Sequence, residues 1–191
     1  MKSKIAGWLL KLWGWKVEGK YPISYPKNIV VVVPHTSWVD FPLGILVRSY
    51  RKMPTRFLGK KSLFRPPFGA LFKWLGGYPV DRTGSANMTE AVVKIFDAHK
   101  EFDIAIAPEG TRKKVERLRT GFYWIAKNAG ASIILTKFDY EAKSVSFSPP
   151  FFTTDDPDAD YKYISDYFKG TRGKVPAYSF GYPSTNTEGK R

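Results

Sequence analysis

The run Ile29-Val30-Val31-Val32-Val33, ended by Pro34, decides the fold class of this chain. All of its residues before the proline are apolar and β-branched, which predicts a strand buried on both faces of a parallel or mixed sheet. A second β-branched run, Ser132 to Phe138, predicts another strand of the same kind. Shorter extended segments are expected at residues 56–58, 78–80, 103–107 and 144–147.

Helical patterns alternate with these strands, at residues 37–50, 68–75, 87–99, 120–128 and 157–168. The clearest is 87–99, where Asn87 and Glu90 resemble a capping box and the apolar residues that follow recur at helical spacing. This alternation predicts an α/β fold, with a largely parallel or mixed central sheet flanked by helices. Ligands of such folds bind at the carboxyl ends of the strands.

Length and composition favour a single domain over residues 1–191. With 43% hydrophobic residues, a chain of this size can bury roughly 70% of the surface that its unfolded form exposes. Residues 171–191 are rich in Gly, Pro, Ser and Thr, and we expect them to form a loose tail. Because the chain has no cysteine and only 2 histidines, disulfides, thiolate zinc sites, iron–sulfur clusters and a cysteine nucleophile are excluded.

Residues 1–17 predict an N-terminal amphipathic helix. On a helical wheel, three tryptophans and four aliphatic residues share one broad arc, while Lys4 and Lys11 lie on the other side. The chain carries 31 Lys and Arg against 17 Asp and Glu, a net charge of +14, which predicts an anionic partner. We therefore expect this helix to lie on an anionic membrane surface. The alternative is a terminal helix docked on the core of the protein itself.

The expected location of the protein in the cell follows from two features that the sequence lacks, a long apolar run and a signal-peptide cleavage site. The longest strictly apolar runs, residues 29–33 and 122–126, are far too short to span a bilayer. The basic start has no cleavage site of a signal peptide, so we expect a mature protein. Together these features predict a cytoplasmic protein, peripheral on the inner face of the cell membrane.

The loop Pro34 to Asp40 holds the first candidate site. If His35 precedes the following helix, the loop can fold back so that the carboxylate of Asp40 holds one imidazole nitrogen. The other nitrogen is then free to take a proton, because the pKa of histidine lies close to neutrality. A capping role explains Asp40 equally well, because Ser37 and Asp40 have the spacing of a capping box and Pro42 suits a helix that begins near Asp40.

The loop Pro108 to Arg112 holds the second candidate site. Gly110 permits a turn with positive φ, after which Thr111 and Arg112 present a hydroxyl and a guanidinium at the end of a strand. These groups suit a phosphate. Arg82 is a candidate for a second guanidinium, and the alternative for Arg82 is a surface ion pair with Asp81.

Three blocks of sequence together resemble the 1-acylglycerol-3-phosphate acyltransferase family, the glycerolipid acyltransferases. They are His35 to Asp40, Gly76 to Arg82 and Pro108 to Arg112, and both their order and their spacing agree with the family pattern. The resemblance implies that His35 deprotonates an acceptor hydroxyl and that Asp40 orients His35.

The resemblance also implies the substrates. A fatty acyl group would pass from a thioester of coenzyme A or of an acyl-carrier protein to the free hydroxyl of a lysolipid, most simply 1-acylglycerol-3-phosphate, in membrane phospholipid biosynthesis. Arg82 and Arg112 would bind the acceptor phosphate, and Glu109, Gly110 and Thr111 would shape that site. A thioester is already activated, so we expect no metal and no other cofactor.

Other functions remain open at this point. The acceptor could be a different lysolipid, or the same His and Asp could pass the acyl group to water. A lipid-binding protein without catalysis is also possible. A basic nucleic-acid-binding module is the alternative from another class, but the basic residues are spread along the chain and no recognition motif is present. We therefore expect lipid partners rather than nucleic acid.

Overall fold

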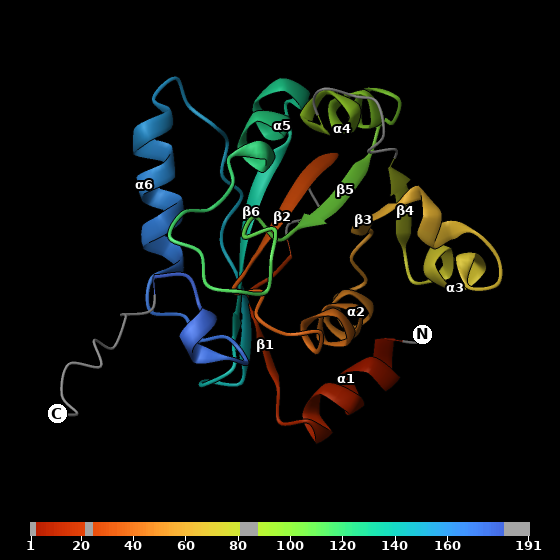
Figure 1. The fold of residues 1–191 in the computed structure, drawn as a ribbon. Coiled ribbons are helices and arrows are strands. Elements are labelled where there is room, and N and C mark those ends of the chain that lie inside the picture. Colours follow the sequence, from red (N-terminus) through yellow and green to blue (C-terminus); the bar gives the residue numbers. More distant parts are fainter. Residues whose placement is uncertain (1–2, 22–24, 81–87, 182–191) are drawn as a thin grey trace, which may run out of the picture.

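The computed structural model describes residues 3–21, 25–80 and 88–181. Within these ranges the chain forms a seven-stranded sheet in the order β1-β7-β6-β2-β5-β3-β4 (Figure 1). Neighbouring strands are parallel except β6 and β7, which are antiparallel. The strands are β1 (Lys16–Glu18), β2 (Lys27–Val33), β3 (Arg56–Lys60), β4 (Gly77–Val80), β5 (Phe102–Ile106), β6 (Ser132–Asp139) and β7 (Ser144–Phe147). The predicted α/β fold with a mixed central sheet is confirmed.

Helices cover both faces of this sheet. The α-helices are α1 (Ser3–Leu12), α2 (Asp40–Arg51), α3 (Gly69–Trp74), α4 (Met88–Asp97), α5 (Gly121–Ala129) and α6 (Pro157–Phe168), and the short 3₁₀ helices are η1 (Lys61–Phe64) and η2 (Pro176–Tyr178). One face packs against α4, α5 and α6, and the other face packs against α1 and α2. The sheet is therefore the middle layer of three.

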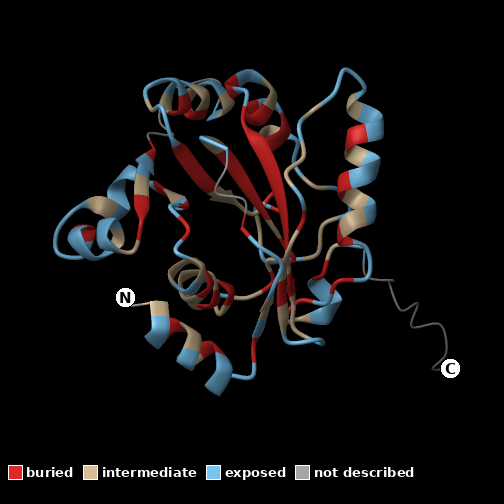
Figure 2. Cartoon of the chain, turned by 180° about the vertical axis from the view of Figure 1, so that it is seen from behind, coloured by how far each residue is buried: buried red, intermediate tan, exposed pale blue. Residues whose placement is uncertain are grey.

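The apolar run that predicts β2 supplies both cores. Its side chains alternate, so that Ile29, Val31 and Val33 enter the core under α4, α5 and α6, while Val30 enters the core under α1 and α2. Complete burial of one such side chain stabilises the fold by about 1.5–3 kcal/mol. Figure 2 shows the central strands as the most deeply buried part of the chain.

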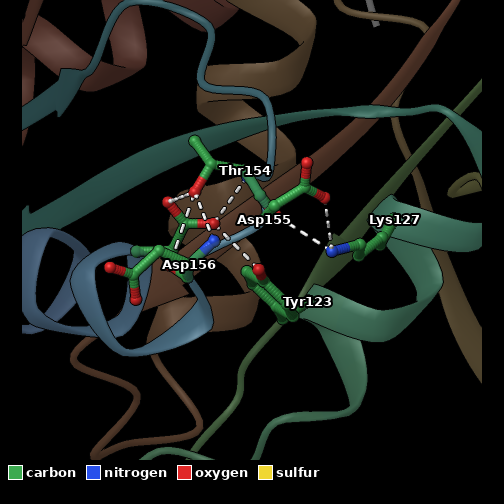
Figure 3. Close-up of polar contacts among 6 residues, drawn as sticks. Tyr123, Lys127, Thr154, Asp155 and Asp156 are labelled. Carbon is green, nitrogen blue, oxygen red and sulfur yellow. Dashed lines mark hydrogen bonds and ion pairs between the residues drawn. The ribbon is translucent and has the colours of Figure 1, made fainter.

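A buried carboxylate attaches α6 to the rest of the molecule (Figure 3). Asp160 accepts hydrogen bonds from the hydroxyl of Tyr123 at 2.8 Å, the backbone N–H of Thr154 at 2.7 Å and the hydroxyl of Thr154 at 2.9 Å. At the start of the helix, the carboxylate of Asp156 accepts the backbone N–H of Ala159 at 3.0 Å. This N-cap, followed by Pro157, explains where α6 begins.

The N-terminal segment differs from the expected helix over residues 1–17. The helix ends at Leu12, and Gly14 turns the chain with a φ of 78° into β1, which pairs with β7. Trp15 consequently leaves the apolar arc of the wheel and is only 4% exposed, with its ring edge-on to that of Tyr140 at 4.8 Å. In α1 itself, Ala6 and Leu10 are buried, and Leu10 belongs to the core that α2 shares, so one face of the helix is docked on the protein.

The expected loose tail also differs from the structure over residues 171–181. Thr171 and Ser179 are buried, the backbone N–H of Gly173 donates to the hydroxyl of Ser179 at 2.8 Å, and Val175 N–H donates to Oγ1 of Thr36 at 3.1 Å. Small polar residues are here hydrogen-bond partners rather than a sign of disorder. Residues 182–191 lie outside the described residues, as does Asn87 of the expected capping box.

Candidate active site

The two loops singled out in the sequence meet at one edge of the sheet. β2 and β5 are adjacent and parallel, with Val31 paired to Ile106, so both strands end at the same edge. His35 follows β2 after a single proline, and Glu109 follows β5 after two residues. This is the carboxyl edge, where ligands of parallel sheets bind.

His35 and Asp40 are in contact, with Nδ1 of His35 3.1 Å from Oδ2 of Asp40. The contact is possible because α2 begins only at Asp40, so the preceding loop folds back on the carboxylate. The same oxygen of Asp40 accepts the backbone N–H of Ser37 at 2.9 Å. Asp40 therefore holds both the imidazole and the backbone of the loop before α2. It is not the N-cap of the helix, because that position is Val39 and no side chain caps it.

Tyr140 is a third member of this cluster that the sequence did not reveal. Its hydroxyl donates to Oδ1 of Asp40 at 2.6 Å, and its own backbone N–H donates to the carbonyl of Arg172 at 2.8 Å. Burial, together with the neighbouring Asp40 carboxylate, raises the pKa of Tyr140 above its ordinary value, so the phenol stays protonated. The only signal in the sequence is its place one residue beyond β6, at the same edge of the sheet.

Glu109 turns inward toward His35. It is 2% exposed, and its Oε2 accepts the backbone N–H of His35 at 2.5 Å, which couples the two loops. The other oxygen, Oε1, is buried and has no hydrogen-bond partner among the described residues. Burial raises the pKa of Glu109 to about 7, although the His35 N–H acts in the opposite direction. The carboxyl group therefore titrates near neutrality.

The predicted phosphate-binding residues lie on the outer part of the second loop. Gly110 has a φ of 63°, as the turn requires, and a Cβ at this position would lie 2.6 Å from the guanidinium of Arg119. Thr111 is half-buried and its hydroxyl accepts the backbone N–H of Lys113 at 3.3 Å, whereas Arg112 is exposed. Arg82 lies outside the described residues. The structure thus brings together His35, Asp40 and Glu109, and leaves Arg112 facing solvent.

An apolar cavity of about 200 Å³ extends from His35 and Asp40 between α2 and the sheet. Its walls include Val32 of β2, Gly44 and Ile45 of α2, and Phe57 of β3. Arg48 and Arg56 also line the cavity, and burial together with the charge of Arg56 lowers the pKa of Arg48. The sequence did not reveal the cavity, because its lining residues follow the same alternation as ordinary core residues.

Within residues 3–21, 25–80 and 88–181, the His, Asp and Glu side chains form no cluster of three or more that could hold a metal ion. Among the helices of those ranges, none combines the length and the apolar character that crossing a membrane requires.

The sequence model of the Acyltransferase family matches residues 14–137. The chain belongs to this acyltransferase family. The matched residues include both loops of the site, from His35 to Asp40 and from Pro108 to Arg112, whereas Tyr140 lies just beyond them. The suspected family is therefore confirmed.

Curated relatives and a solved structure agree with membership of the acyltransferase family. The 1-acyl-sn-glycerol-3-phosphate acyltransferase of Salmonella typhimurium is 31% identical over 136 residues, which are 67% of this chain and 54% of the relative. The enzyme of the same name from Escherichia coli K12 is 30% identical over 136 residues, with the same shares covered. The chain thus spans about half the length of the curated relatives it matches.

The crystal structure of the 1-acyl-sn-glycerophosphate acyltransferase PlsC from Thermotoga maritima has a TM-score of 0.57 and 19% sequence identity. The similarity covers 86% of this chain and 74% of that chain. At this identity the likeness concerns the fold, which is the fold of an acyltransferase.

Proposed function

We propose that this protein is an O-acyltransferase that moves a fatty acyl group from a thioester to the free hydroxyl of a lysolipid. The observation that carries the proposal is the contact of 3.1 Å between His35 and Asp40, which both line an apolar cavity in a chain of the acyltransferase family. The acceptor that the relatives' names favour is 1-acylglycerol-3-phosphate. The site would then serve membrane phospholipid biosynthesis.

His35 acts as the general base in this proposal. The Asp40 carboxylate accepts a hydrogen bond from Nδ1–H of His35, so that Nε2 is the free nitrogen that takes the proton of the acceptor hydroxyl. The hydroxyl oxygen attacks the thioester carbonyl, a C–O bond forms, and the C–S bond breaks. The departing thiolate then receives the proton from His35. A positioned proton transfer of this kind contributes roughly 10²–10⁴ to the rate.

The cavity between α2 and the sheet is the place for the acyl chain. Its walls are almost entirely apolar and it begins beside His35, so a chain lying in it would bring the thioester carbonyl next to the imidazole. The carrier of the thioester is either coenzyme A or an acyl-carrier protein. Because the thioester is already activated, we propose that the reaction needs no metal and no prosthetic group.

The acceptor phosphate is assigned to Arg82 and Arg112, with Glu109, Gly110 and Thr111 shaping the loop beside them. The exposed position of Arg112 suits this role, because a lysolipid headgroup would approach from the solvent side of the edge. We further propose that residues 1–191 act as one acyltransferase domain. It would be cytoplasmic and peripheral on the inner face of the cell membrane, and residues 1–17 would contact anionic lipid through the exposed side chains of α1.

The test is a transfer assay with a defined donor and a panel of acceptors. The purified protein is incubated with a labelled acyl thioester and lysolipids that differ in headgroup, and the products are separated. We expect labelled diacyl lipid with wild type, none with His35→Ala, and normal product with His99→Ala, which removes the other histidine of the chain. Labelled fatty acid released without any lysolipid would instead identify a hydrolase.

A further inference from the structure

The segment from η1 to the end of α3 exposes large apolar side chains that its own core does not need. Phe64 and Phe72 pack against each other inside the segment, with ring centroids 6.4 Å apart. The outward side chains are Leu63, Phe68, Leu71 and Trp74, which are 45%, 63%, 48% and 68% exposed. Scattered single residues of this kind are normal on a protein surface, but a contiguous group marks a site of interaction.

The helix α1 also exposes large apolar side chains. Ile5, Trp8 and Leu12 are 49%, 62% and 71% exposed. A groove of about 750 Å³ runs between α1, α2 and α3, with Ser3 of α1 and Trp74 of α3 both in its wall. In Figure 1, α1 lies below α2, and α3 lies to the right of α2 and above it. The groove thus brings the start of α1 and the end of α3 to one surface, and Trp74 is the exposed apolar residue of the η1–α3 segment that lines it.

The charged residues of α1 and of residues 41–80 are all basic. Residues 41–80 contain eight Lys and Arg and no Asp or Glu, and α1 adds Lys4 and Lys11, again without an acidic residue. Arg65 and Lys73 are exposed beside Phe68 and Trp74. Surfaces that face only water usually mix both signs of charge. Aromatic residues within a basic surface are what an interface with anionic lipid headgroups selects.

We propose that the segment Lys61–Trp74 is a second membrane contact, which inserts into the same anionic leaflet as α1. The protein would lie on the bilayer with the groove between α1, α2 and α3 facing lipid. An acidic protein partner would match the basic charge of the segment, but that charge match alone would leave the exposure of four large apolar side chains unexplained. The inference deepens the membrane part of the proposed function and rests on it for the lipid substrate.

The test is binding to vesicles of equal parts phosphatidylglycerol and phosphatidylcholine, measured by sedimentation. The variant Phe68→Ser/Trp74→Ser is compared with Trp124→Ser/Phe152→Ser, which removes two exposed aromatic residues from α5 and the segment before α6. We expect the first variant to lose about tenfold or more in vesicle affinity, because partial insertion of each ring contributes through its buried apolar area. The second variant should bind as wild type does.

A charge variant covers the case in which the apolar variant fails to fold. Arg65→Glu/Lys73→Glu changes only exposed residues of the segment and should weaken binding at low salt, whereas Lys100→Glu/Lys169→Glu should weaken it much less. Vesicle affinity equal to that of the matched control in both comparisons would overturn the proposal. Retained vesicle binding with loss of binding to an acidic acyl-carrier protein would also overturn it.

Acyl transfer to a detergent-dispersed lysolipid separates this inference from the proposed function. Loss of vesicle binding with transfer intact supports the second membrane contact. If wild type shows no transfer while the segment variants still lose vesicle binding, the proposed chemistry fails and the membrane contact stands.

Discussion

The phenol of Tyr140 donates a 2.6 Å hydrogen bond to Oδ1 of Asp40, while the other carboxylate oxygen of Asp40 contacts His35. The carboxylate is thereby held from two sides, and its orientation toward the imidazole is set by a residue 100 positions further along the chain. Tyr140 itself is held by the carbonyl of Arg172 and by the ring of Trp15. The position of His35 thus depends on contacts of Tyr140 with Trp15, near the N-terminus, and with Arg172, near the C-terminal end of the described residues.

Removal of the Tyr140 hydroxyl tests how much its hydrogen bond to Asp40 contributes to the rate of acyl transfer. In Tyr140→Phe the carboxylate keeps its contact with His35 but loses a donor, and a hydrogen bond to a charged group contributes about 1.5–3 kcal/mol. We expect kcat to fall roughly tenfold to a hundredfold with little change in KM for the acyl thioester. Tyr25→Phe, which alters an exposed tyrosine, is the matched control. Equal kcat values for Tyr140→Phe and Tyr25→Phe would show that the Tyr140 hydroxyl does not contribute to catalysis.

The buried carboxyl of Glu109 predicts a pH dependence of stability. Its pKa rises from 4.5 to about 7 in the folded protein, so between these values the folded state binds more protons than the unfolded state. The free energy of unfolding therefore falls as pH rises through this window, by roughly 3 kcal/mol. Denaturant unfolding of wild type and Glu109→Gln from pH 4 to 8 should show this fall in the wild type relative to the variant. Parallel curves would contradict the prediction.

Arg112 is expected to act on acceptor binding rather than on the chemical step. Arg112→Ala should lower kcat/KM about tenfold or more for a phosphorylated lysolipid, because a charged hydrogen bond to the headgroup is lost. For a lysolipid with an uncharged headgroup the loss should be small. Arg117→Ala, which removes another exposed arginine of the same loop, serves as the comparison. An equal loss with both acceptors would speak against a phosphate role.

Gly44 offers a way to fill the cavity. A Cβ at this position would meet the ring of Phe138 at 3.7 Å, which is ordinary contact, and Gly44 lies in the wall of the cavity. Gly44→Leu should therefore reduce transfer of long acyl chains more than transfer of short ones. Gly121→Leu, at the start of α5, is the matched control and should leave the preference for chain length unchanged. Competition between thioesters of different chain length measures the effect.

Local patterns were sufficient for much of this fold. The β-branched run at Ile29 predicts a central strand, and the residues of the loops after β2 and β5 are enough to mark both loops as candidate sites. Only the structure shows that these two strands are neighbours. The contact of His35 with Asp40 was predictable because both residues lie in one loop and its helix.

Other features of the fold and of the site could not be predicted, because they depend on contacts between residues far apart in sequence. Tyr140 meets Asp40 only because β6 lies beside β2 in the sheet. Trp15 belongs to the apolar arc of a helical wheel, yet the turn at Gly14 ends that helix and the ring is buried against Tyr140. Residues 171–181 have the composition of a tail, and they are ordered by acceptors such as Thr36 that no local pattern reveals.

The hydrogen bond from Val175 to Thr36 ties the residue next to His35 to a segment that is translated more than a hundred codons later. While the nascent chain emerges from the ribosome, the sheet can begin to assemble. The hydrogen bond between Val175 and Thr36, which holds the His35 loop, can form only after residues 171–180 have been synthesised. Cleavage between Phe168 and Val175 would leave Val175 on a separate fragment, held to the His35 loop by non-covalent contacts alone, without cutting any strand.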